Sequence, residues 1–246
     1  MMPPRRRAVQ FFVTVTYRPL PRETDGANPM ADYHSPRKIM FQIKRRAFIF
    51  ELLAFSVFLP GARPTHGAQN EAIAVIERFH ASLLAVMKEA EVLGIRGRYK
   101  RLAAPIDKAF HLALMIRIAT GSFWRSAGAG QRKQLLEAFT RLSVSTYADR
   151  FDGYGGEAFE TMGAKAGPRK TLIVQTRIQR LRADSVGISY VMKPVKGRWR
   201  IVDVLLDDSI SELAVRRSEY RRVLKKDGVN GLIQTLNSKA AQLVNG

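Results

Sequence analysis

Three stretches in the second half of the chain alternate apolar and polar side chains: TLIVQTRIQR (171–180), SVGISYVMK (185–193) and RWRIVDVLL (198–206). A period of two residues is typical of strands with one buried face. The link KPVKGRW (193–199) has a glycine at a hairpin position, so we expect neighbouring antiparallel strands. Together with AFETMGAK (158–165), these stretches predict a twisted antiparallel sheet of about four strands.

Before the strands, the apolar residues recur at helical spacing. The pattern predicts a helix over residues 70–93 that ends at Gly94, short helices over 98–110 and 111–120, and a long helix over 129–151. We therefore expect helices to dominate the first half of the domain.

After the strands, the helical period returns. One face of the first predicted helix carries Ile210, Leu213, Tyr220 and Leu224, and a final helix follows over 230–244. Helices, then a sheet, then helices again predict an α+β fold, with residues 70–246 forming one domain.

Residues 1–68 lack the helix and strand patterns of the rest of the chain. Residues 1–39 have no sustained period, and we expect an unstructured extension that reflects the choice of start codon. Residues 40–68 combine a basic cluster (44–46), an apolar run (47–59) and small residues, which is the order of a signal peptide. The run is shorter than the ~20 residues of a membrane span, so cleavage is predicted, with an uncleaved anchor as the alternative.

The composition narrows the classes of function. The formal charge of +20 fits nucleic acid or an anionic membrane surface as a partner. The chain has no cysteine, which excludes disulfides, thiolate metal sites and cysteine nucleophiles.

The sequence contains few candidates for catalytic or metal-binding residues. His80 and His111 lack a second ligand at metal-binding spacing, and each is predicted to be a helix-surface or helix-start residue. Asp203, on a predicted inward strand face, is either a general base or the partner of an arginine, and we favour the arginine. Asp207 and Asp208 are predicted to cap the following helix. We expect no cofactor, no metal and no catalysis.

A basic run, RRSEYRRVLKK (216–226), lies on the penultimate predicted helix. We expect its positive side chains opposite the apolar stripe, on a solvated face that can contact anionic lipid headgroups or an acidic protein rather than nucleic acid. The predicted surface consists of Arg216, Arg217, Arg221 and Arg222.

Several stretches, in order and spacing, resemble the MlaC (toluene-tolerance auxiliary) family across about residues 70–240. They are FHLALMIRIATGSFWRSA (110–127), TYADRF (146–151), VQTRI (174–178), ISYVM (188–192), GRWRIVDV (197–204) and SISELAVRRSEY (209–220). His111 replaces the acid that usually follows the phenylalanine, and Asp208 stands where glycine is common. The sequences of residues 83–107, 150–154 and 210–220 are more similar to the hopanoid-biosynthesis-associated branch, HpnM, than to MlaC proper.

The resemblance implies an NTF2-like α+β domain that encloses an apolar cavity for acyl chains. It also implies a periplasmic carrier of phospholipid or hopanoid that serves an inner-membrane lipid transporter complex and outer-membrane lipid-handling proteins. The predicted cavity residues are large apolar side chains on inward faces: Phe79, Leu83, Met115, Ile118, Trp124, Tyr147, Val174, Ile188 and Tyr190.

Two other functions compete with the carrier. An NTF2-like enzyme would use the same cavity as an active site, with Asp203 or His111 as base. A cytoplasmic nucleic-acid binder would show steeply salt-dependent affinity for DNA and would not be exported.

Overall fold

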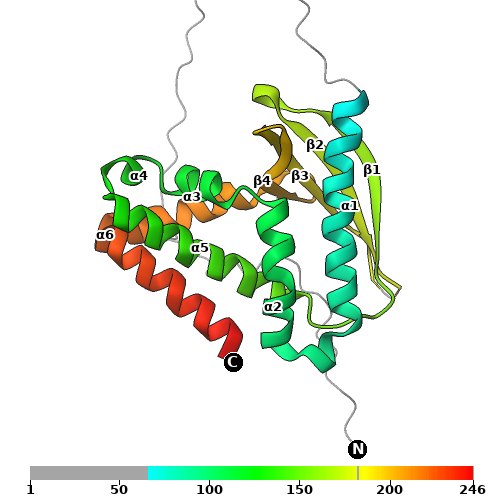
Figure 1. Ribbon diagram of the computed structural model, residues 1–246, viewed down its shortest axis with the longest axis horizontal. Coiled ribbons are helices and arrows are strands. Elements are labelled where there is room, and N and C mark those ends of the chain that lie inside the picture. Colours follow the sequence, from blue (N-terminus) through cyan, green and yellow to red (C-terminus); the bar gives the residue numbers. More distant parts are fainter. Residues whose placement is uncertain (1–65, 182, 246) are drawn as a thin grey trace, which may run out of the picture. The chain divides into compact units, whose positions relative to one another are not determined.

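The computed structural model describes residues 66–181 and 183–245, and the predicted extension (1–39) and signal peptide (40–65 of 40–68) lie outside them. Five helices come first and a last helix follows the sheet (Figure 1). Their bounds are α1 His66–Lys88, α2 Ala90–Ala109, α3 Leu112–Thr120, α4 Ser122–Ser126, α5 Ala129–Arg150 and α6 Glu212–Asn245. The strands are β1 Ala158–Ala166, β2 Leu172–Gln179, β3 Val186–Val195, β4 Arg198–Leu206 and β5 Ile210–Ser211. The predicted α+β class is confirmed.

The sheet is an antiparallel meander in the order β1-β2-β3-β4-β5. The β3–β4 hairpin turns through Lys196 and Gly197, which have φ angles of 48° and 75°, as the glycine in this link predicts. The short β5 was missed. Ile210 belongs to it and is exposed, so its placement on the apolar face of a helix was wrong.

One face of the sheet is covered by helices. In Figure 1, α1 crosses this face, and α5 and α6 pack together beside it. The alternation predicted for β2 is observed, because Leu172, Val174, Thr176 and Ile178 are all buried. The core lies between this face and the helices.

The helix boundaries in the first half differ from the prediction. The first helix ends at Lys88, and Gly94, with a φ of 53°, forms a kink inside α2. The helix predicted over 98–110 is therefore the second part of a longer α2. A glycine in the left-handed region can end a helix or bend it, and the local sequence does not decide which.

The start of α6 is capped by side chains that the sequence did not predict. Asp203 Oδ1 accepts hydrogen bonds from the amides of Leu213 (3.0 Å) and Val204 (2.8 Å), and Ser211 Oγ accepts one from the amide of Ala214 (2.9 Å). The hydroxyl of Ser211 also donates to Asp203 Oδ2 at 2.5 Å. Asp203 is thus a capping residue, and the expected arginine partner was wrong.

Asp207 and Asp208 are not helix caps. Both adopt left-handed backbone conformations, with φ angles of 46° and 58°, in the turn between β4 and β5. The carboxylate of Asp208 accepts a hydrogen bond from the hydroxyl of Ser189. Aspartate tolerates this backbone region better than most residues, so Asp207 and Asp208 allow the chain to turn between β4 and β5.

Candidate functional site

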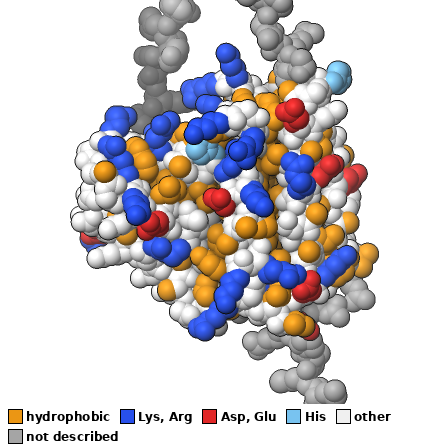
Figure 2. All heavy atoms as spheres, in the orientation of Figure 1, with side chains coloured by type: hydrophobic (Ala, Val, Ile, Leu, Met, Phe, Trp, Pro, Cys, Tyr) orange, Lys and Arg blue, Asp and Glu red, His pale blue; other side chains and the backbone are white. Residues whose placement is uncertain are grey.

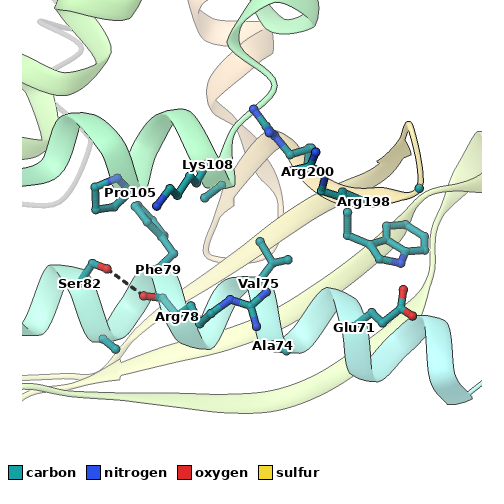
Figure 3. Close-up of a pocket in the computed structure, with 14 residues that line it drawn as sticks. Glu71, Ala74, Val75, Arg78, Phe79, Ser82, Pro105, Lys108, Arg198 and Arg200 are labelled. Atoms are coloured by element: carbon teal, nitrogen blue, oxygen red, sulfur yellow. Dashed lines mark hydrogen bonds between the residues drawn. The ribbon is translucent and has the colours of Figure 1, made fainter.

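An open groove lies between α1, the end of α2 and the β3–β4 hairpin (Figure 3). Its volume is about 760 Å³, within the range of ~300–1,000 Å³ that is typical of small-molecule sites. The apolar part of its lining consists of Ala74, Val75, Phe79, Ala81, Pro105, Ala109, Gly197 and Trp199. Small side chains on α1 leave the space that larger ones would fill.

The groove also carries charge, and the charge is mostly positive. Its charged residues are Glu71, Arg78, Lys108, Arg198 and Arg200. The guanidinium of Arg200 donates to the carbonyls of Phe110 (2.8 Å) and Asp107 (2.5 Å), which closes the end of α2 and ties it to β4. Within 66–181 and 183–245, the other three cations form no ion pair. Their charges are available to a ligand.

A second, much smaller cavity of about 20 Å³ lies further inside. Its lining includes Phe110, Met115, Tyr147 and the ion-paired Glu212 and Arg216. Phe79 of the groove packs edge to face on Phe110 and Tyr147, with ring centroids 5.3 and 5.5 Å apart. An aromatic wall therefore separates the groove from the inner cavity.

His80 is a core residue, so its predicted place on a helix surface was wrong. Its Nε2 lies 2.9 Å from the hydroxyl of Tyr190, and its ring stacks on Phe159 at 4.3 Å. Burial lowers the pKa of His80 to about 3. The imidazole is therefore neutral at physiological pH and links α1 to the sheet.

The predicted cavity residues fall into different places. Phe79 lines the groove, and Met115 and Tyr147 line the inner cavity. Leu83, Val174, Ile188 and Tyr190 are buried in the core without lining either space. Trp124 is half-buried and Ile118 is 38% exposed, and neither lines a described cavity.

Sequence reasoning missed most of the groove, including Val75 and Trp199. On α1, the signal was a stripe of small residues at helical spacing beside the core stripe, namely Ala74, Ala81 and Ser82. The predicted cavity residues are large apolar side chains, which fill space rather than leave it. The local sequence of the β3–β4 hairpin does not indicate which of its residues line the groove, because that depends on how the sheet packs against α1.

The predicted basic surface on α6 is formed only in part. Arg217, Arg221 and Arg222 are exposed, but Arg216 points inward. Its Nε lies 3.7 Å from Glu212, and its guanidinium carbon lies 5.6 Å from the ring centroid of Phe139. The helical turn places Arg216 on the buried side, so including it in the surface was wrong.

The residues suggested for catalysis line neither space. Asp203 caps α6, and His111 begins α3, where its amide donates to the carbonyl of Ile201 at 2.8 Å. Burial, with help from the nearby cations of Arg200, Arg117 and Lys193, lowers the pKa of His111. In the described part of the chain, no group of three or more His, Cys, Asp or Glu side chains could hold a metal ion.

The comparisons with known proteins agree with this architecture. The family model for MlaC proteins matches residues 77–238. The chain belongs to the MlaC family. Among solved structures, a phospholipid-binding protein from Ralstonia solanacearum in complex with a phospholipid matches this MlaC protein with a TM-score of 0.62 and 20% sequence identity. The match covers 70% of this chain and 98% of that one.

At this identity the likeness establishes the fold, and the predicted MlaC-type α+β architecture is confirmed. The comparison with curated proteins gives no match. The assignment to the HpnM branch is tested by none of these comparisons and stays a prediction.

Proposed function

We propose that this MlaC protein is a noncovalent phospholipid carrier of the periplasm. The observation that carries the proposal is the groove, which combines an apolar lining with unpaired cations at a volume suited to an amphiphile. Family membership and the phospholipid in the related Ralstonia structure support it.

The physics of lipid transfer explains why a groove is needed. Each buried CH₂ group is worth ~0.8 kcal/mol, so an acyl chain of ~16 carbons would cost on the order of 10 kcal/mol to expose to water. A carrier must cover most of that chain. The groove supplies apolar side chains from α1, α2 and the β3–β4 hairpin for this purpose.

We further propose that the protein shuttles the lipid between the inner and outer membranes. It would exchange the lipid with a transporter complex in the inner membrane and with lipid-handling proteins at the outer membrane. The exposed Arg217, Arg221 and Arg222 provide a basic face that suits brief contact with anionic membranes. None of the helices in 66–181 and 183–245 is long and apolar enough to span a bilayer. Export would depend on the predicted signal at 40–68.

The direct test is native mass spectrometry of protein purified from the periplasm without detergent. We expect a stoichiometric lipid that extraction identifies as a phospholipid. Protein that is lipid-free and takes up no lipid from vesicles would contradict the proposal.

A groove-filling variant locates the ligand. Ala74→Trp adds a large ring to the α1 side of the groove, and we expect it to abolish uptake. Ala241→Trp adds the same ring at an exposed position of α6 and should leave uptake unchanged. Equal uptake by both variants would show that the lipid lies elsewhere.

A further inference from the structure

We infer that the groove selects lipids with a net anionic, phosphate-bearing headgroup through Arg78, Lys108 and Arg198. The inference rests on the proposed lipid binding and adds the class of headgroup. It chooses anionic phospholipid over zwitterionic phospholipid and over a neutral hopanoid.

The cations come from separate elements that converge on the groove. Arg78 lies on α1, Lys108 near the end of α2, and Arg198 at the start of β4 (Figure 3). The three residues are exposed, so their side chains can adjust to a headgroup at the groove surface. A phosphate at the groove surface can receive charge-assisted hydrogen bonds from these side chains.

The charges of Arg78, Lys108 and Arg198 are not neutralised by ion pairs within the described part of the domain. Among the described residues, none of the three groove cations forms an ion pair, and the pairs of Arg101 with Glu89 and of Arg216 with Glu212 lie away from the groove. Arg200, the fourth cation, is held by the carbonyls at the end of α2 and adds fixed positive charge to the groove. Glu71 is the one acid in the lining, so the balance is strongly positive.

Charge balance discriminates between headgroups. A phosphatidylglycerol headgroup carries one net negative charge, whereas phosphatidylethanolamine adds an ammonium group that the cations repel and only Glu71 can attract. Basic side chains also predominate over acidic ones on the face drawn in Figure 2, which adds to the positive field. A neutral hopanoid gains nothing from either contribution.

The test offers the protein equal amounts of phosphatidylglycerol and phosphatidylethanolamine with identical acyl chains in mixed vesicles, and measures the bound lipids by native mass spectrometry. We expect the wild type to prefer phosphatidylglycerol by about tenfold, which corresponds to ~1.4 kcal/mol. The preference should fall towards unity in ~1 M salt, where charges are screened beyond ~3 Å.

The decisive variant is Arg78→Gln/Lys108→Gln/Arg198→Gln, for which we expect a preference for phosphatidylglycerol below about twofold. The control Lys133→Gln/Lys165→Gln/Lys239→Gln removes the same charge from exposed positions outside the groove and should keep the wild-type preference. Lipid uptake with an unchanged preference in the groove variant would overturn the inference. Failure of the wild type to bind any lipid would overturn the proposed function itself.

Inorganic phosphate separates a lipid site from a free-phosphate site. Because the acyl chains supply most of the binding energy, ~1 mM phosphate should not displace phosphatidylglycerol. Displacement at that concentration would assign the cations to free phosphate and contradict the inference. Stronger binding of a hopanoid than of phosphatidylglycerol in the same assay would also overturn it.

Discussion

The ring of Phe79 meets the ring of Phe110 edge to face, with 5.3 Å between their centroids. Phe79 lines the outer groove and Phe110 lines the inner cavity, so the contact lies in the wall between the two spaces. Movement of the Phe79 ring would therefore open the groove towards the inner cavity.

Removing this ring should join the two spaces. We expect Phe79→Ala to lower the free energy of unfolding by about 3–5 kcal/mol, because Phe79 is almost fully buried, and to change the chain lengths of the bound lipid towards longer ones. Urea denaturation and native mass spectrometry measure the two effects. Leu232→Ala, which empties a buried site away from both spaces, should destabilise the fold without altering the lipid profile. An unaltered profile in Phe79→Ala would contradict the role of the wall.

The buried His80 should make the fold sensitive to mild acid. Its pKa is about 3 in the folded protein and 6.5 when unfolded, so the unfolded state binds more protons between these values. Stability attributable to His80 is complete above pH 6.5 and is lost as the pH falls. At pH 5 the loss amounts to ~2 kcal/mol.

The check is the difference in unfolding free energy between pH 7.5 and pH 5, measured for wild type and His80→Gln. Glutamine can still reach the hydroxyl of Tyr190 but does not titrate, so the variant should lose ~2 kcal/mol less than the wild type over this interval. Other titrating groups cancel in the comparison. Equal losses would show that His80 is not buried in the neutral form.

The basic side chains of α6 should divide into two classes. Arg216→Met breaks the inward contacts with Glu212 and Phe139, and we expect a loss of about 2–3 kcal/mol in the free energy of unfolding. Arg221→Met alters an exposed side chain and should change stability by less than ~0.5 kcal/mol. Chemical denaturation of both variants distinguishes buried pairing from surface display, and equal losses would refute the division.

The exposed members of the same helix should act on membranes instead. We expect Arg217→Glu/Arg221→Glu/Arg222→Glu to weaken co-sedimentation with vesicles rich in phosphatidylglycerol by at least tenfold at ~0.15 M salt, at ~1 kcal/mol per lost cation. Binding of lipid inside the groove should not change. Undiminished vesicle binding would remove this face from the proposed membrane contact.

The strands could be predicted because their period of two is a local property, and Leu172 to Ile178 alternate as the buried face requires. The groove could not, because it forms where Ala74 of α1 faces the hairpin around Trp199, and this pairing depends on tertiary packing. Asp203 shows the same limit, since its capping partners lie up to ten residues further along the chain. Arg216 was misplaced because the prediction followed the run of charges, although its spacing from Leu213 and Tyr220 puts it on the buried side of α6.

The two tryptophans of the chain can report whether an acyl chain lies in the groove. Trp199 lines the groove and Trp124 does not, so Trp124→Phe and Trp199→Phe each leave one reporter. With a phospholipid brominated on its acyl chain, we predict strong fluorescence quenching of Trp199 and little quenching of Trp124. Bound lipid that quenches Trp124 while leaving Trp199 unaffected would show that the acyl chain lies outside the groove.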